Sequence, residues 1–474
     1  MSLRLPHRLA AFLFLLATLS LVLSGCSGEE KKTEQKEEKK PAIEVFGDAP
    51  SWPAELEKVS LGTSLEEWQK ALGIEQDTLK SKTFEGIEYD IDADKDHGNA
   101  VQRLSIRFEQ EDAKAYFTEK WGTPTQVKSY GDDVTYYWYN PAVRLRIGFE
   151  VSASAGRWRA DFTTYIPMAE VIGTAPGPLG FEKDKPLLGL TDAEISAAYP
   201  KFVRQVSAEE DAAQKANIEA IAPEARGMMG EASAHVDFKL PPTETGAYWT
   251  NVSLFYRESN NKVERFSLST KVAPGGDKAI LDLLEAKYGK PVVGKEKDVD
   301  RFYFFSPDKQ LRVIAGMDTI STDEFEIRVS NYLPLDQLVG KEKGKLAFFG
   351  EKQPFGALTK DEFSTTYKEF LPSPDSSSIH VAPTEYEEYF TSIGVFFDTK
   401  TNLARTVSFE IALEPNASYR EYVLNYFKAA YGEPTPHKRH TEAEPYWVFA
   451  GDLPVTLRLG YKGNSWNVEF GSLF

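Results

Sequence analysis

Four aspartates alternate along one short stretch of the chain: Asp90, Asp92, Asp94 and Asp96. Carboxylate oxygens at a spacing of two are what calcium-binding loops use. A helix-flanked calcium loop counted from Asp92 needs glycine at its sixth position and glutamate at its twelfth, where this chain has His97 and Arg103. The same alternation is typical of a polar edge strand that runs into a hairpin turn. Calcium binding stays open, and the strand is the favoured interpretation.

Two histidines lie among glutamates near the C-terminus, a combination that could bind a transition metal: His437 and His440 with Glu433, Glu442 and Glu444. Prolines 434 and 436 precede them, so they fall in a loop that imposes no helical spacing. A solvated loop is therefore the favoured interpretation, and we assign no metal site.

Catalytic signatures are scarce. His235 and Asp237 could form a catalytic pair, but no nucleophile is identifiable beside them. The sequence has no Gly-x-Ser-x-Gly elbow, no phosphate loop and no His-Glu-x-x-His zinc helix. The sequence therefore predicts a protein that is not an enzyme, with no cofactor and no catalytic residue.

Aromatic residues gather in three short runs, at 136–139, 302–305 and 446–449. Neighbouring residues in a strand face opposite ways, so half of each run should pack in the core. The other half should lie on the open face of a sheet. Exposed aromatic side chains there would be a contact surface for a protein or a glycan.

The only cysteine of the chain, Cys26, follows Ser24 and Gly25 behind a basic start and an apolar stretch at 9–23. This pattern resembles bacterial lipoprotein export signals. The resemblance implies that residues 1–25 are a signal peptide, removed once the Cys26 thiol carries diacylglycerol, and that Cys26 is the lipid attachment site. The alternative is an uncleaved anchor with an incidental cysteine.

A charged stretch follows the signal, and we read 26–43 as a flexible tether. A short charged helix is the alternative, because glutamate and lysine form helices well. By resemblance to the sorting rules of diderm envelopes, Ser27 favours the outer membrane. We expect a lipid-anchored protein whose globular part lies in the periplasm or at the surface.

The remainder of the chain repeats three times. Three capping boxes, each preceded by a glycine and followed by an apolar residue, mark three helix starts: Ser64 to Glu67, Thr191 to Glu194 and Thr359 to Glu362. Three aromatic-Gly-x-Pro sequences mark the ends of three further helices, with their glycines in a left-handed conformation: Gly122, Gly289 and Gly432. The sequence predicts three modules, at 44–172, 173–339 and 340–474, the second with a partly helical insertion near 204–245.

Between and after the two helices of each module, polar turns and alternating apolar residues indicate strands. Each module should therefore be α+β, in the order helix, hairpin, helix and three-stranded meander. We expect the hairpin and the meander to form one five-stranded antiparallel sheet with the two helices on one face.

The order of glycine, capping box, aromatic-Gly-x-Pro helix end and polar-faced meander resembles the β-lactamase-inhibitor-protein-like modules. It resembles more loosely the small lipoproteins that assist outer-membrane barrel assembly. The resemblance implies protein binding on a sheet face and carries no catalytic residue.

These patterns favour a non-catalytic envelope lipoprotein that binds or scaffolds another envelope protein through its sheet faces. Its expected partners are the lipid bilayer, through the acylated Cys26, and an envelope protein. The formal charge of −17 opposes nucleic acid as a partner, because like charges repel. The alternative is an envelope protein that binds or cleaves a glycan, using aromatic platforms and a pair of carboxylates.

Overall fold

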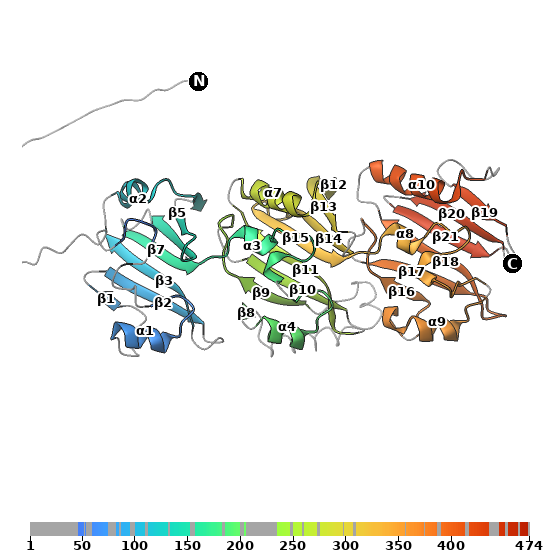
Figure 1. Cartoon of the computed structure of the whole chain (residues 1–474), viewed down its shortest axis with the longest axis horizontal. Coiled ribbons are helices and arrows are strands. Elements are labelled where there is room, and N and C mark those ends of the chain that lie inside the picture. The colour runs from blue at the N-terminus through green and yellow to red at the C-terminus, as the bar shows by residue number, and fades with distance from the viewer. Residues whose placement is uncertain are drawn as a thin grey trace, which may run out of the picture. The chain divides into compact units, whose positions relative to one another are not determined.

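The computed structural model describes residues 46–472, apart from a long gap at 205–234 and shorter gaps elsewhere, among them 74–81 and 436–444. The signal, the whole tether with Cys26, and the candidate metal ligands His437, His440, Glu442 and Glu444 lie outside the described residues. Three antiparallel sheets follow one another along the described chain, with helices between their strands. The expected α+β class with three sheet-based modules is confirmed (Figure 1).

The first module is a seven-stranded sheet with the order β1-β2-β3-β7-β6-β5-β4. Strand β3 pairs with β7 and thereby joins the first strands to the meander. Its elements are α1 (Leu65–Leu72), β1 (Lys82–Phe84), β2 (Ile87–Asp94), β3 (Ala100–Glu109), α2 (Ala113–Trp121), β4 (Gln126–Tyr130), β5 (Asp133–Asn140), β6 (Leu145–Val151) and β7 (Arg157–Thr164).

The second module repeats this plan as an eight-stranded sheet with the order β12-β13-β14-β15-β11-β10-β9-β8. Its helices are α3 (Met168–Ile172), the 3-10 turn η5 (Gly180–Glu182), α4 (Asp192–Ala198) and α7 (Gly276–Tyr288). Its strands are β8 (Val203–Arg204), β9 (His235–Leu240), β10 (Thr250–Arg257), β11 (Lys262–Lys271), β12 (Val292–Glu296), β13 (Val299–Ser306), β14 (Leu311–Met317) and β15 (Glu324–Asn331).

The third module is a six-stranded sheet with the order β16-β17-β18-β21-β20-β19. Its helices are α8 (Leu335–Leu338), η7 (Ala347–Phe349), α9 (Lys360–Thr366), η8 (Lys368–Phe370) and α10 (Ala417–Tyr431). Its strands are β16 (Ser378–Val381), β17 (Thr391–Phe397), β18 (Ala404–Ala412), β19 (Tyr446–Phe449), β20 (Val455–Lys462) and β21 (Ser465–Ser472).

The expected five strands per sheet are too few. In the first two modules, β4 and β12 extend the meander by one edge strand. In all three modules an additional strand flanks the hairpin, namely β1, β9 with β8, and β16. These edge strands are two to six residues long, too short for a clear alternation of apolar residues. Of the insertion expected near 204–245, the long gap lies outside the described residues, and 235–240 is the strand β9.

All three capping boxes form as the sequence predicts. In α1 the Glu67 N–H donates to the Ser64 hydroxyl at 3.2 Å, and the Ser64 N–H donates to the Glu67 carboxylate at 3.0 Å. Thr191 with Glu194 and Thr359 with Glu362 make the same reciprocal pair of bonds at α4 and α9. Each box satisfies two N–H groups that a helix start otherwise leaves without a partner.

Glycine ends the second helix of each module. Its φ is positive, as expected, but at two of the three glycines ψ differs from that of the left-handed helical conformation. Gly122 has φ 82° and ψ −177°, and Gly289 has φ 86° and ψ −173°. Gly432 also has a positive φ, of 89°. At the first two glycines ψ is extended, which lies outside the left-handed helical region and is accessible essentially to glycine alone.

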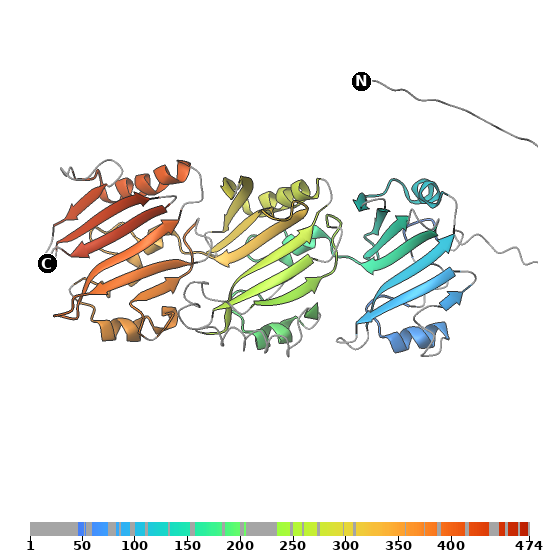
Figure 2. The same ribbon diagram turned by 180° about the vertical axis from the view of Figure 1, so that it is seen from behind.

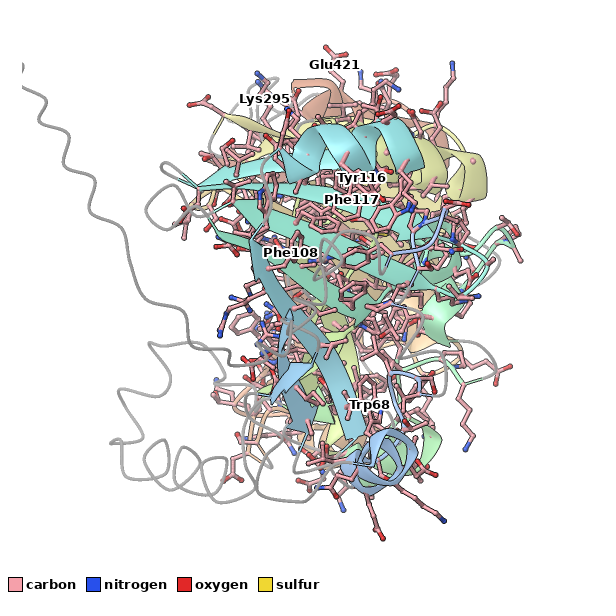
Figure 3. All side chains as sticks on the ribbon, turned by 90° about the vertical axis from the view of Figure 1, so that its left-hand side faces the viewer. Trp68, Phe108, Tyr116, Phe117, Lys295 and Glu421 are labelled. Atoms are coloured by element: carbon pink, nitrogen blue, oxygen red, sulfur yellow. The ribbon has the colours of Figure 1, made fainter. Side chains whose placement is uncertain are left out.

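Each module has its own apolar core between its sheet and its helices. In the first, Trp68 of α1 and Phe117 of α2 are fully buried. Figure 3 shows Trp68 beside α1 and Phe117 beside α2, at different places along the same sheet. The core of the second module includes Met168 of α3, and that of the third includes Leu335 of α8. Both short helices therefore pack with the module that follows them.

The junction between the first two modules, here called the first joint, is made by a hairpin loop of the second. The Ile166 N–H donates to the Pro242 carbonyl at 3.0 Å. The Met168 N–H, at the start of α3, donates to the Glu244 carboxylate at 2.9 Å. A carboxylate at this position both accepts a free N–H and opposes the positive end of the helix dipole.

The junction between the last two modules, here called the second joint, repeats these bonds. The Leu333 N–H donates to the Pro383 carbonyl at 2.8 Å. The Leu335 N–H, at the start of α8, donates to the Glu385 carboxylate at 3.0 Å. Both loops carry the sequence Pro-Thr-Glu, so the same three residue types build both joints.

Candidate functional site

One face of each sheet carries no described helix, and we call these three surfaces the open faces. The helices lie over the opposite face in each module (Figure 1), and the view from behind shows the strands uncovered (Figure 2). Register identifies the residues of an open face. Leu104 pairs with Phe162 on the core side, whereas Ser105 pairs with Asp161 on the open side. Each of the three modules has such an open face.

Arginine and aspartate alternate across strands on the first open face. Arg103 of β3 lies 3.3 Å from Asp92 of β2, and Arg107 lies 3.9 Å from Asp90. The aspartates that suggested calcium thus face arginines of the neighbouring strand. Asp94 is the last residue of β2, and Asp96 lies outside the described residues. Among the described residues no three potential metal ligands are grouped.

Ser105 occupies the centre of this face and is 1% exposed. Its hydroxyl donates to the Asp161 carboxylate. Arg159 donates to the same carboxylate at 3.0 Å and to the Ser105 hydroxyl at 3.3 Å. The Ser105 proton is therefore directed to a carboxylate that is already paired with a guanidinium. We call such a cross-strand series of arginines and carboxylates a ladder; it is not the arrangement of a nucleophile with its base.

The second open face carries a tighter network of the same kind. The Arg301 Nε donates to the Glu296 carboxylate at 2.7 Å, and Arg328 lies 3.7 Å from the same carboxylate and 2.9 Å from Glu326. The Arg301 side chain is 2% exposed and lies against Gly316 of the next strand, where a Cβ would be 3.1 Å from its Cδ. The missing side chain at Gly316 lets the arginine lie flat on the sheet.

The expectation that the outer aromatic residues are exposed is wrong for two of them. Tyr137 is 6% exposed and Tyr303 is 2% exposed, although both face away from the core. A Cβ at Gly148 would stand 2.8 Å from the Tyr137 ring, so this ring lies over a glycine of the adjacent strand. The Arg146 guanidinium covers it, 4.6 Å from the ring centroid. Half of each run was predicted to be core, and Trp138 and Phe304 are core residues of these two runs.

The remaining described candidates lie on β9 and after α10. His235 and Asp237 lie two apart on β9 and pair in register with Phe255 and Ser253. Glu433 forms an ion pair with Lys428 at 3.2 Å. Sequence reasoning missed the cross-strand ladders. Their signal was the alternation of arginine with polar residues along the strands, which becomes informative only when the neighbouring strand is known.

No protein-family model, no curated protein and no solved structure matches this chain. Among the described residues, no helix is long and apolar enough to cross a membrane.

Proposed function

We propose that this chain is a non-catalytic lipoprotein of the bacterial envelope, and that it binds or scaffolds another envelope protein through its open faces. The observation that carries the proposal is the set of three sheet faces without a described helix, two of which carry ordered ladders of arginine and carboxylate. The resemblance of the repeats to modules that bind proteins on a sheet face agrees with it.

The ladders suit a protein partner because they are only partly shielded from solvent. The side chains of Arg107 and Asp90 are each 40% exposed, and those of Arg103 and Asp92 are 39% and 64% exposed. Exposed ion pairs contribute little to stability, so their members can exchange one partner for another at low cost. Complementary charges on a second protein would then fix orientation and speed association.

A pull-down from detergent-solubilised envelope, with the full chain as bait, tests the proposal. In the third module Arg458 of β20 is exposed and pairs in register with Glu469, between the core residues Leu457 and Leu459, so it lies on the open face. One open-face arginine in each module is reversed in charge: Arg107→Glu, Arg328→Glu and Arg458→Glu. The matched controls make a cation-to-glutamate change on a helix in each module: Lys70→Glu, Lys278→Glu and Lys360→Glu. We expect a stoichiometric protein partner that at least one open-face variant loses and all helix-face variants keep. Circular dichroism checks that each variant is folded.

The proposal is overturned if wild type captures no protein partner, or if the helix-face changes are the ones that abolish capture. The membrane anchor is tested in the same material by Cys26→Ser. We expect wild type, and not this variant, to incorporate labelled fatty acid, because the variant has no thiol to acylate. Equal incorporation in the two proteins would contradict the lipid attachment at Cys26.

Glycan binding or cleavage is the second candidate, and one observation favours it. A cavity of about 460 Å³ at the second joint is lined by the carboxylates of Asp336 and Glu385 and by two tyrosines. Glu385 is already engaged in capping α8 at Leu335, however, so it does not serve freely as a catalytic acid or base. Recovery of glycan fragments without protein in the pull-down would favour this candidate over the first.

A further inference from the structure

A cavity lies at the second joint, on a scaffold that the two joints share. Seven residues line it: Asp336, Lys341, Glu385, Tyr422, Tyr426, Ala429 and Ala430. They come from α8 and the residues after it, from the Pro-Thr-Glu loop, and from α10 (Figure 1). Of these side chains only Glu385 makes the capping bond on which the joint depends.

The first joint shows which lining residues the scaffold does not need. The sequences of the two joints can be aligned on residues with the same role. Glu244 and Glu385 cap α3 and α8. The core residues Ile280 and Leu284 of α7 correspond to Val423 and Phe427 of α10. On this correspondence four polar or aromatic lining residues are replaced at the first joint, Asp336 by Ala169, Lys341 by Thr174, Tyr422 by Ala279 and Tyr426 by Leu283. These four therefore serve something other than the joint.

An ammonium group of the chain itself occupies the corresponding corner of the first joint. Lys287 stands where the second joint has Ala430, and its Nζ donates to the Pro178 carbonyl at 2.8 Å. A Cβ at Gly173 would be 3.4 Å from this Nζ. The side chain is nearly buried, at 6% exposure. At the second joint the alanine removes this cation and leaves open space.

The groups around that space suit a cation. The Tyr426 hydroxyl donates its proton to the Gly340 carbonyl at 3.1 Å. The lone pairs of the Tyr426 oxygen therefore remain able to accept a hydrogen bond from an ammonium group. Burial raises the pKa of Glu385, and the neighbouring Asp336 carboxylate adds to the rise. A bound cation would relieve this repulsion. Tyr422 is 43% exposed and offers an aromatic ring at the pocket.

We propose that the second joint is a binding site for a small organic ammonium compound, whose cationic group takes the place that the Lys287 ammonium has in the first joint. Asp336, Tyr422 and Tyr426 contact the ammonium group. Lys341, the one lining cation, receives an anionic group of the same molecule. The ligand class is therefore a zwitterion with an amino group at one end.

A matched series of small probes tests the charge requirement on the full chain in detergent: 4-aminobutyrate, butylammonium, 1-butanol and butyrate. All four have a similar carbon chain and differ in charge. Saturation-transfer NMR reports which of them contact the protein. We expect 4-aminobutyrate to bind most tightly, butylammonium to bind more weakly, and 1-butanol and butyrate to give no transfer.

Variants that replace a lining residue by its counterpart at the first joint test the role of each residue. The same scaffold already accommodates those residue types at the first joint. Asp336→Ala and Tyr426→Leu should each weaken 4-aminobutyrate binding about tenfold. Lys341→Thr should remove the advantage of 4-aminobutyrate over butylammonium. Ala430→Lys should abolish binding of both, because the new ammonium would fill the site.

Glu421→Ala is the control. Glu421 lies on α10 beside Tyr422, is exposed and does not line the cavity, and Figure 3 shows it projecting outward. It should bind like wild type. The inference is overturned by equal transfer to all four probes, by no transfer to the two amines, or by unchanged binding in both Asp336→Ala and Ala430→Lys. Binding of N-acetylglucosamine without the amines would also overturn it and would assign the cavity to a glycan.

Discussion

Glu182 is a buried acid whose environment changes its proton affinity. Its carboxylate accepts the N–H groups of Leu179 and Leu187 at 2.7 and 2.8 Å, and the residue is 2% exposed. Burial raises its pKa to about 7, against the lowering effect of these hydrogen bonds and of the charge on Lys287. The third module replaces this arrangement by the neutral Gln353, which accepts the Leu346 N–H at 2.9 Å.

The raised pKa predicts a loss of stability as pH rises. Below about 4.5 Glu182 is protonated in both the folded and the unfolded chain, so it contributes no pH dependence there. Between about 4.5 and about 7 the unfolded chain releases its proton first, which favours unfolding by on the order of 3 kcal/mol. Calorimetry of Glu182→Gln at a series of pH values should show a melting temperature that falls less over this range than that of wild type. Glu421→Gln, at an exposed site, should follow wild type. Parallel curves for all three proteins would refute the assignment.

At the scale of elements, the short helices depend on their capping boxes. Helix α9 has seven residues, too few to be stable by propensity alone. The Glu362 N–H donates to the Thr359 hydroxyl at 3.2 Å, and the Thr359 N–H donates to the Glu362 carboxylate at 3.0 Å. Packing of Phe363, which is fully buried, completes the anchoring of this helix.

Removing the cap should therefore cost stability in the third module. Thr359→Ala leaves the Glu362 N–H without its acceptor and should destabilise by about 1 kcal/mol, measured by urea unfolding. Thr365→Ala is the matched control, because the Thr365 hydroxyl donates to the Asp361 carbonyl within the same helix and caps nothing. An equal loss in the two variants would show that the cap contributes nothing specific.

At the scale of the whole molecule, the joints couple modules that have separate cores. The Glu244 carboxylate receives the Met168 N–H through both oxygens, at 3.1 and 2.9 Å. Its partner lies 76 positions earlier in the chain. Helix α3 packs in the core of the second module and directly follows β7 of the first. The Glu244 side chain therefore holds the start of α3, next to the residues that link the two sheets.

We expect Glu244→Ala to weaken that coupling. Loss of a hydrogen bond to a charged group costs about 2 kcal/mol, so calorimetry should show the melting of the first two modules becoming less cooperative. Glu170→Ala, which removes an exposed ion pair with Arg144 from the same helix, should change little. Unchanged cooperativity in Glu244→Ala would mean that the first joint holds without this cap, through the Ile166–Pro242 bond and apolar packing.

The sequence by itself determined the features that residues close in the chain can specify. Thr191 and Glu194 are three positions apart and meet within one helical turn, so their residue types suffice to predict the cap. Alternation along a strand likewise predicted that half of each aromatic run lies in a core. The class of the fold and its threefold repetition follow from such local signals.

Only the tertiary structure decided which distant residues meet. The burial of Tyr137 depends on Gly148 and Arg146 of the adjacent strand, and the cap at Met168 depends on Glu244, 76 positions later in the chain. The cavity at the second joint lies beside Ala430, at the position where the first joint has Lys287, and it brings together residues of α8, of the Pro-Thr-Glu loop and of α10. Contacts of this kind depend on strand register and on the packing of whole modules, and the spacing of residues along one strand or helix does not contain them.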